Sequence, residues 1–327
     1  MGYVPPFSLT DEMLQLVSEI SELLGRIKGI DALEKLPRLQ RIGRIRSIHS
    51  SLAIENNTLT LDQVTDIIDG KRIIGPPDEI LEVQNAYAAY NKLKDIDPYE
   101  MQDMLRAHKV MMNGLIEESG RFRTVNAGVF TSDGQAVHKA PQPSQVPGFM
   151  RGLFDWLRIS KTPELIRSSV FHYEFEFIHP FRDGNGRMGR LWQTAILMKW
   201  RPVFEWLPVE SIIRERQREY YEAIRASTKN GNSNVFIVYM LEAILDAVKA
   251  IVSDAQKHIN HMNDRVRNLI SVLEEYPQSA AELMGRLNLV SRNAFRDNYL
   301  RPAIEAGLVS MTEPNKPTSR NQKYLRR

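Results

Sequence analysis

The chain has 327 residues, of which 25% are charged and 43% are hydrophobic, and this is ordinary for a globular protein with one large and one small domain. It excludes a disordered chain, a coiled-coil rod and a small disulfide-stapled protein. The absence of cysteine also excludes a thiolate nucleophile and cysteine-based zinc or iron–sulfur sites. The most apolar run, 235–248, contains Glu242 and Asp246, so no segment is expected to span a membrane. The first residues lack the pattern of a signal peptide, and a cytoplasmic protein is therefore expected.

The net charge of +3 is distributed unevenly. Residues 258–327 carry an excess of lysine and arginine, whereas the rest of the chain is close to neutral. An excess of this size is compatible with a nucleic-acid or acidic partner at the C-terminal end but does not require one.

The first part of the chain is predicted to be helical. Thr10 precedes an apolar pattern of helical spacing, and Thr60 with Gln63 has the sequence of a capping box. Prolines at 76–77 and at 98 are expected to begin further helices. Later helices are expected over residues 144–158, 162–177, 187–199, 211–227 and 233–257.

Residues 129–138 break this helical pattern. Asp133-Gly134 is a turn signal between two short runs typical of strands, so the segment is predicted to be a lone β-hairpin. A two-stranded hairpin is marginally stable by itself. We therefore expect it to pack on a neighbouring element, either as a structural feature or as part of a functional site.

The pattern changes again near residue 260. Helices are expected over 263–275, 279–287 and 291–304, and Gly307 begins a stretch that suits a strand, a basic wing and a second strand. This order is typical of a winged helix-turn-helix domain, which is predicted for residues 258–327.

The segment 179–190, with the sequence HPFRDGNGRMGR, carries the strongest indication of function. One helix is predicted to end before Pro180 and a second to begin near Arg187, with Gly184 and Gly186 in the loop between them. A glycine-containing loop that leads into a helix N-terminus exposes backbone N–H groups that can bind an anion.

Charged side chains beside this loop indicate phosphate chemistry. Arg187 and Arg190 are placed in the first turn of the second helix, where each cation opposes the helix dipole by roughly 0.3–1 kcal/mol. Two cations in that position indicate a multiply charged anion as ligand. Asp183 is a hard oxygen ligand suited to Mg²⁺, and His179 is suited to act as a general base near neutral pH. The set predicts phosphoryl or nucleotidyl transfer.

Two other interpretations of this segment are less favourable. Residues 184–189 also match the G-x-G-x-x-G fingerprint of dinucleotide-binding proteins. However, they follow a helix with Glu174 and Glu176 rather than an apolar strand, and no alternating βαβ pattern surrounds them. A lone histidine after an apolar helix, or a Gly-Asn-Gly turn, most often has a structural role only.

The segment 179–190 resembles the H-P-F-x-[DE]-G-N-G-R-x-x-R motif of Fic-domain proteins at every specified position. The resemblance covers residues 40–250 and implies an all-helical core with a β-hairpin flap. It implies an N-terminal helical region over 1–100, a Fic catalytic core over 101–257 and the winged-helix domain over 258–327. It also implies an enzyme, a protein adenylyltransferase that moves AMP from ATP to a Ser, Thr or Tyr hydroxyl of a target protein or of the chain itself.

The same resemblance assigns roles to single residues. Gly186 is retained, which favours AMP transfer over the other group transfers known in the family. Family members of this kind often self-associate, so a homodimer is expected. The implied roles are general base for His179, Mg²⁺ ligand for Asp183, α-phosphate contacts for Gly184, Asn185 and Gly186, and β- and γ-phosphate contacts for Arg187 and Arg190.

A second segment matches an inhibitory motif of the same family. Ser51, Glu55 and Asn56 fit the pattern [S/T]-x-x-x-E-[G/N], which is weak alone because Ser and Glu four apart are common on helices. Beside the complete motif, it implies that Glu55 pairs with Arg190, occupies the γ-phosphate position and keeps the resting enzyme weakly active. In some relatives the same glutamate assists removal of AMP, so the direction of the reaction stays open.

Four further residues are candidates for substrate contacts. The resemblance places adenine contacts near Tyr220 and Tyr221, although packing in the core is an equal alternative. It places the target side chain along the hairpin, where Val137 and His138 are the candidates.

The C-terminal domain supports an alternative function. The chain would then be a DNA-binding transcriptional regulator whose Fic core senses nucleotide, although such a domain can equally dock other proteins. The basic residues on or near the expected recognition helix and wing are Arg292, Arg296, Arg301, Lys316, Arg320 and Lys323.

Overall fold

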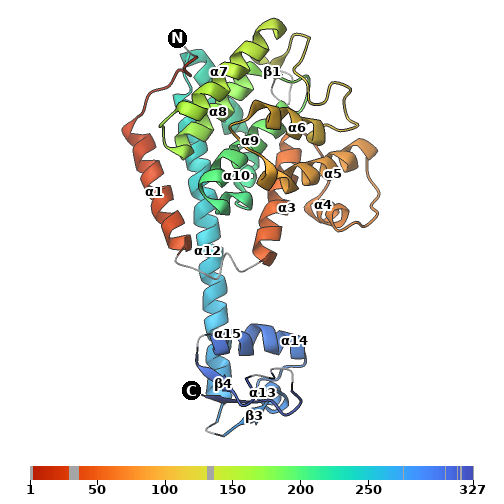
Figure 1. Ribbon diagram of the computed structural model, residues 1–327, viewed down its shortest axis with the longest axis vertical. Coiled ribbons are helices and arrows are strands. Elements are labelled where there is room, and N and C mark those ends of the chain that lie inside the picture. Colours follow the sequence, from red (N-terminus) through yellow and green to blue (C-terminus); the bar gives the residue numbers. More distant parts are fainter. Residues whose placement is uncertain are drawn as a thin grey trace. The chain divides into compact units, whose positions relative to one another are not determined.

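The computed structural model describes residues 3–28, 37–130, 136–274, 276–305, 307–314, 316 and 319–326. The chain is mainly helical, with a two-stranded and a three-stranded sheet (Figure 1). It divides into two compact units, Met1–Ile251 and Val252–Arg327, and the division falls within the long helix α12 (Asn234–Val272). In the described ranges, no helix is both long enough and apolar enough to cross a membrane.

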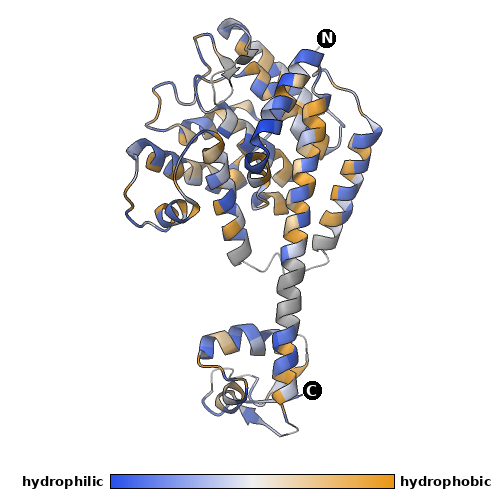
Figure 2. Cartoon of the chain, turned by 180° about the vertical axis from the view of Figure 1, so that it is seen from behind, coloured by the Kyte–Doolittle hydropathy of each residue, from blue (hydrophilic) through white to orange (hydrophobic). Residues whose placement is uncertain are grey.

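Two helices of the first unit have the N-terminal caps that the sequence predicts. The Thr10 hydroxyl accepts a hydrogen bond from the Met13 N–H at the start of α1 (Asp11–Lys28), at 3.2 Å. The predicted capping box of Thr60 and Gln63 starts α4 (Leu61–Ile68). Figure 2 shows polar and apolar residues alternating along α1, as expected for a helix with one buried face. The other helices before the hairpin are α3 (Pro37–Ile54), α5 (Pro77–Asn91), the short η1 (Leu93–Asp95) and α6 (Met101–Met111).

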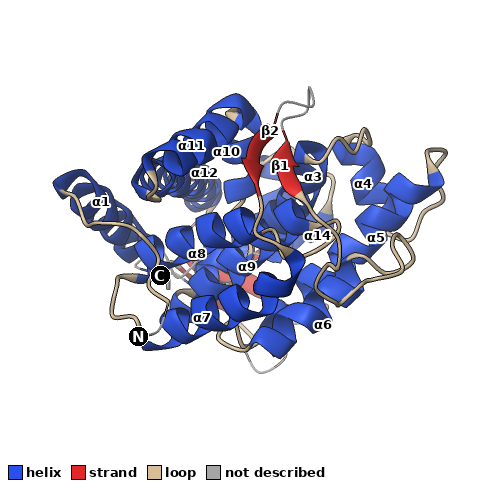
Figure 3. Ribbon diagram, turned by 90° about the horizontal axis from the view of Figure 1, so that it is seen from above, coloured by secondary structure: helices blue, strands red, loops and turns tan. Residues whose placement is uncertain are grey.

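Two helices at the centre of the first unit carry the motif. α8 (Glu164–Ile178) and α9 (Asn185–Trp200) pack on each other (Figure 3). Most of their residues are buried. A helix enclosed on all sides needs no polar face, so periodicity does not mark its ends; those of α8 lie next to Pro163 and Pro180. Around them lie α1, α3, α6, α7 (Val146–Ile159, preceded by η2, Pro143–Gln145) and η3 (Pro202–Glu205).

The predicted hairpin is present. β1 (Gly128–Phe130) and β2 (Ala136–Lys139) pair in antiparallel fashion, with Val129 opposite His138. Its turn at Asp133-Gly134 lies outside the described residues. β2 lies against α11 (Gln217–Asn230), so the hairpin packs on a neighbouring helix as expected.

Two helix predictions are wrong in their limits. The single helix predicted for 211–227 is two helices, α10 (Val209–Glu215) and α11, separated at Arg216, where no glycine or proline marks a break. Conversely, the helices predicted for 233–257 and 263–275 are one helix, α12. No glycine or proline lies between residues 257 and 263, so nothing in the sequence ends the helix there.

The second unit contains the end of α12, further helices and a three-stranded sheet. The strand order is β3-β5-β4, and β3 (Gln278–Ser279) was not predicted. Ser279 ends this strand and also caps α13, because its hydroxyl accepts a hydrogen bond from the Glu282 N–H at 3.3 Å. The winged-helix assignment itself stays a prediction. The remaining elements are α13 (Ala280–Arg286), α14 (Arg292–Phe295), η4 (Arg296–Leu300), α15 (Arg301–Glu305), β4 (Val309–Met311) and β5 (Lys323–Arg326).

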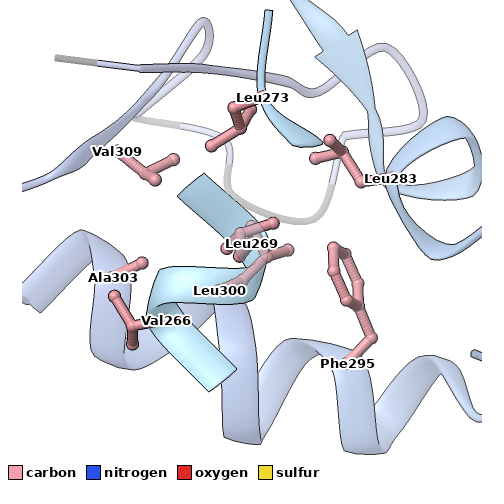
Figure 4. Packing of buried hydrophobic residues seen from close by; sticks show 8 residues of the cluster. All are labelled: Val266, Leu269, Leu273, Leu283, Phe295, Leu300, Ala303 and Val309. Atoms are coloured by element: carbon pink, nitrogen blue, oxygen red, sulfur yellow. The ribbon is translucent and has the colours of Figure 1, made fainter. Parts of the chain in front are cut away.

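The second unit has its own hydrophobic core (Figure 4). Each helix of this unit and the strand β4 contribute to it, so the unit buries apolar surface without help from the first unit's core. The buried members are Val266, Leu269, Leu273, Leu283, Phe295, Leu300, Ala303 and Val309.

Candidate active site

The motif predicted to bind phosphates lies in the loop between α8 and α9. α8 ends at His179, which has a left-handed backbone (φ 51°, ψ 61°), and α9 begins after Gly184 (φ 81°). The first hydrogen bond of α9 runs from the Met188 N–H to the Gly184 carbonyl, at 3.0 Å. The N–H groups of residues 185–187 therefore lie at the open end of the helix, where an anion can accept hydrogen bonds from them.

The side chain of Asn185 holds this loop in shape. Its Nδ2 donates to the Phe181 carbonyl and its Oδ1 accepts from the Phe181 N–H, both at 2.9 Å. The side chain that was expected near a phosphate thus bonds to the backbone of the loop. This arrangement leaves the backbone N–H of Asn185 for an anion.

The predicted inhibitory motif lies against the second arginine of the loop. The guanidinium of Arg190 is buried, and its Nε donates to the Ser51 Oγ at 3.0 Å. Its Nη2 donates to the Ser51 carbonyl at 2.9 Å and to the Glu55 Oε1 at 2.7 Å. The ion pair of Glu55 and Arg190 that the sequence predicts is therefore present.

The Glu55 carboxylate also lies directly over Gly186. A Cβ atom at Gly186 would be 2.2 Å from Glu55 Oε1 and 3.1 Å from Arg190 Nη1. Only glycine allows the carboxylate to come this close to the start of α9. Glu55 therefore occupies the position in which the loop would present its N–H groups to another anion.

Asn56 is in the turn that follows α3, directly after Glu55. Its backbone is left-handed (φ 71°), and the next N–H, of Asn57, donates to the Leu52 carbonyl at 3.1 Å. Asparagine adopts this conformation more readily than most residues, which suits it to a helix C-terminus. The third residue of the predicted inhibitory motif thus turns the chain immediately after Glu55.

Two carboxylates hold Arg187, the first arginine of the loop. Its Nη1 donates to Glu82 Oε1 at 2.7 Å, and its Nη2 donates to Asp183 Oδ1 at 3.1 Å. Glu82 also accepts a hydrogen bond from Asn57 Nδ2 at 2.8 Å. Glu82 lies in α5, 105 residues before Arg187, and no pattern in the sequence marked it.

Asp183 fits the part of a Mg²⁺ ligand in a nucleotide complex. Its side chain is 57% exposed beside the open end of α9, although Arg187 shares one carboxylate oxygen. Mg²⁺ is usually held by one or two carboxylates, with phosphate oxygens and water as its remaining ligands. Across the described residues, no group of three or more His, Cys, Asp or Glu side chains could hold a metal. An ion at Asp183 would therefore take its other ligands from a nucleotide and from water.

A buried carboxylic acid lies beside the predicted general base. The His179 side chain is 17% exposed, and its Nδ1 is 3.9 Å from Oε2 of Glu176, one turn earlier on α8. Burial raises the pKa of Glu176 to about 8. The positive charge of Arg190 lowers this pKa, and the negative charge of Glu55 raises it further. Glu176 therefore keeps its proton at neutral pH.

The two tyrosines predicted to contact adenine differ in position. Tyr220 is in the interior, with its hydroxyl 3.1 Å from Nε2 of His172, whose Nδ1 lies 2.6 Å from Gln193 Oε1. Burial lowers the pKa of His172 to about 3, so this imidazole is neutral. Tyr221 is only partly buried. The core-packing alternative thus describes the position of Tyr220.

His108, in α6, contacts the loop between α8 and α9. No pattern in the sequence indicated this role. Its ring stacks on Phe181 at 3.6 Å, its Nδ1 accepts from the Gly120 N–H at 2.8 Å, and its Nε2 is 2.9 Å from the Asp183 carbonyl. Because the Gly120 N–H can only donate, the proton of His108 is on Nε2 and points to Asp183. Burial lowers the pKa of His108 to about 4, which preserves this neutral form at physiological pH.

The remaining candidates lie outside this cluster. Val137 and His138 are residues of β2, of which the structure describes the backbone but not the side chains. In the second unit, Arg296 pairs with Asp297 at 2.8 Å, and Arg301 Nε is 3.8 Å from Glu305. Of the other predicted cations, Arg292 begins α14, Lys323 begins β5, and Lys316 and Arg320 are exposed between β4 and β5.

Comparison with known proteins identifies the class of protein. Residues 98–197 match the model of the Fic/DOC family, and residues 264–326 match that of the Filamentation induced by cAMP protein Fic-like, C-terminal domain. The crystal structure of a Fic family protein from Desulfovibrio desulfuricans G20 is 45% identical, with a TM-score of 0.75. The match covers 99% of this chain and 98% of that one. The chain belongs to the Fic family, and the resemblance and the mainly helical Fic fold predicted from the sequence are confirmed.

Two curated relatives are longer proteins than this chain. The protein adenylyltransferase Fic of Nematostella vectensis is 31% identical over 245 residues, which are 70% of this chain and 53% of that protein. The protein adenylyltransferase fic-1 of Caenorhabditis elegans is 29% identical over 240 residues, 68% of this chain and 43% of that protein. The chain thus spans about half the length of the curated relatives that it matches.

Proposed function

We propose that the chain is a protein adenylyltransferase that transfers AMP from ATP to a Ser, Thr or Tyr hydroxyl of a target protein or of itself. The observation that carries the proposal is the open N-terminus of α9, with two buried arginines beside it and His179 at the other end of the same loop. The names of the curated relatives, protein adenylyltransferases, support the same activity.

In the proposed reaction, Nε2 of His179 takes the proton of the target hydroxyl. The hydroxyl oxygen then forms a bond to the α-phosphorus of ATP, and the bond from that phosphorus to the bridging oxygen of the β-phosphate breaks. Pyrophosphate leaves, and AMP remains on the target. The N–H groups of residues 185–187 and the guanidinium groups of Arg187 and Arg190 would bind the phosphates and stabilise the charge that develops. A Mg²⁺ ion held by Asp183 would neutralise phosphate charge.

We propose further that Glu55 inhibits this reaction. Its carboxylate takes a hydrogen bond of Arg190 at 2.7 Å and covers Gly186. A phosphate brought to the same place would meet a like charge and would find one N–H of Arg190 already bonded. Nucleotide would therefore bind weakly or in an unproductive position while α3 is in place.

The proposal predicts stronger labelling after removal of Glu55. Wild type, Glu55→Gly and Glu55→Gln are incubated with Mg²⁺ and ATP that is labelled at either the α- or the γ-phosphate. Protein-bound label is expected from α-labelled ATP only, and Glu55→Gly should raise it by about 10-fold or more, because it removes a charge-assisted hydrogen bond. Glu55→Gln keeps the size of the side chain and should raise it less.

The control is His179→Ala in the Glu55→Gly background, which should lose the label while the fold, measured by circular dichroism, is unchanged. Label from γ-labelled ATP would instead indicate a kinase. Absence of label from both, on the chain and on cell lysate, would contradict the proposal and would put the DNA-binding alternative first. We rank that alternative second because Arg296 and Arg301 already pair with carboxylates on the same helical segment.

A further inference from the structure

Arg123 is a buried cation whose described partners are backbone carbonyl groups. It precedes β1, and its residue is 3% exposed. Its Nε donates to the His179 carbonyl at 2.7 Å, and its Nη2 donates to the Ile178 carbonyl at 3.3 Å. The guanidinium also donates to the Val125 carbonyl, from Nη1 at 2.8 Å, and to the Pro141 carbonyl, from Nη2 at 2.6 Å.

These contacts join the motif loop to both ends of the hairpin. Ile178 and His179 end α8, Val125 lies shortly before β1, and Pro141 follows β2. The backbone N–H of Arg123 adds a fifth bond, to the Pro180 carbonyl at 2.9 Å. Because every acceptor is a backbone atom, the guanidinium fixes the path of the chain in all three segments at once.

The geometry needs an arginine. A guanidinium presents its N–H donors in a planar fork, so one side chain can reach carbonyl groups in several directions. A lysine ammonium concentrates its charge and its donors on one nitrogen, so it could bind only some of these carbonyl groups. Burial of the cation is costly and lowers the pKa of Arg123, and its hydrogen bonds to the carbonyl groups compensate for the lost hydration.

The bond to the His179 carbonyl bears on the conformation of the general base. His179 has a left-handed backbone, which few residues other than glycine adopt. Rotation of the backbone at His179 away from this conformation would move its carbonyl away from Arg123 Nε, and the bond would be lost. The arginine therefore stabilises the backbone conformation that determines where the imidazole points.

We propose that Arg123 is a positioning residue, which fixes the imidazole of His179 and the β1–β2 hairpin relative to each other. This inference rests on the proposed function. In AMP transfer, a target hydroxyl held along the hairpin would reach the imidazole of His179 only if the distance between the hairpin and His179 stays fixed. Arg123 itself would touch neither the nucleotide nor the target.

The test compares Arg123→Gln and Arg123→Lys with the matched variant Arg121→Gln, all in the Glu55→Gly background. Arg121 is an exposed arginine two residues away. We expect Arg123→Gln to lower kcat for AMP transfer by about 10²-fold, as a misplacement near 1 Å does, with the KM for ATP changed by less than about two-fold. Arg123→Lys should retain more of the rate, and Arg121→Gln should match the parent.

Two measurements that need no catalysis accompany the kinetics. The imidazole resonances of His179, assigned with His179→Ala in ¹⁵N-histidine spectra, should shift in Arg123→Gln, while those of His49 stay in place. Hydrogen exchange should become faster at the amides of β1 and β2 but not in α5. These two measurements test whether Arg123 positions His179 and the hairpin even if AMP transfer is never observed. Failure of the proposed function can therefore be distinguished from failure of this inference.

Two results would overturn the inference. One is a kcat in Arg123→Gln within about two-fold of the parent. The other is a loss of kcat with unchanged His179 resonances and unchanged exchange in the hairpin. If Arg123→Gln does not fold, the same criteria apply to Arg123→Lys.

Discussion

Glu176 holds its carboxyl group in the interior beside two imidazoles, with ring nitrogens of His172 and His179 each 3.9 Å away. Because burial raises the pKa of this group from 4.5 to about 8, the folded chain keeps a proton that the unfolded chain releases between those values. The folded state binds more protons over that range. Its free energy of unfolding therefore falls as pH rises from 4.5 towards 8.

Glu176→Gln should remove this pH dependence. Glutamine has nearly the same shape and no proton to lose, so the variant should gain stability relative to wild type as pH rises. The slope of that gain is at most about 1.4 kcal/mol per pH unit. Urea unfolding of both proteins at pH 5 and pH 8 measures it, with Glu117→Gln, an exposed position, as the control. Parallel pH profiles of Glu176→Gln and wild type would show that Glu176 is ionised in the folded state.

The sequence identified the motif residues but few of the residues that hold them. His179, Asp183 and the two arginines are adjacent in sequence, so their combined pattern is visible without a structure. Glu82 and Arg123 act on the loop from far along the chain, and each alone looks like an ordinary surface charge. Such supporting contacts depend on how helices pack, which local patterns do not encode.

At the scale of elements, α3 makes one close contact that only a glycine allows. A Cβ atom at Gly43 would be 2.0 Å from the carbonyl oxygen of Trp206, which is a backbone atom and cannot swing aside. Gly43 therefore lets α3 lie directly on the segment after η3. Ser51 is on α3 and Glu55 follows directly after its last residue, Ile54, so this contact also affects how Glu55 meets Arg190.

Gly43→Ala should weaken the proposed inhibition. The added methyl group should displace α3, lower the free energy of unfolding by about 1–3 kcal/mol and raise AMP transfer above wild type. Adding Gly43→Ala to Glu55→Gly should bring no further rise, because both changes act on one ion pair. The measurement is α-labelled ATP incorporation together with urea unfolding.

Gly25→Ala in α1 is the matched control for this prediction, since its Cβ would meet nothing within 4 Å. It should leave both quantities close to those of wild type. A rise of transfer in Gly43→Ala that adds fully to that of Glu55→Gly would mean that α3 does not act through the ion pair of Glu55 and Arg190.

At the scale of the whole molecule, the two units have separate hydrophobic cores. Leu269 is fully buried in the core of the second unit, which takes its members from residues 266–309. The helix α12 contributes to both units, and its length was not predicted because the sequence was divided near residue 260, where composition changes but no helix-breaking residue occurs. Composition identifies a second unit; it does not locate the ends of a continuous helix.

Leu269→Ala should affect the second unit alone. It should lower the stability of that unit by about 2–5 kcal/mol, as other buried leucine truncations do, while AMP transfer in the Glu55→Gly background is unchanged. Calorimetry and the labelling assay measure the two effects. Val290→Ala, at a side chain that is 98% exposed, is the control. A proportional loss of transfer in Leu269→Ala, at a temperature at which the parent protein is fully folded, would mean that the two cores unfold together.

In the proposed mechanism, the bond from Arg190 to Glu55 links two equilibria, the docking of α3 and the binding of nucleotide. The same N–H group of Arg190 would serve either the Glu55 carboxylate or a phosphate, so each partner would exclude the other there. By thermodynamic reciprocity, α3 must weaken nucleotide binding by the same factor by which nucleotide loosens α3. The docked fraction of α3 would then fall as nucleotide concentration rises, and a surface that stabilises docked α3 would reduce apparent nucleotide affinity without touching the nucleotide.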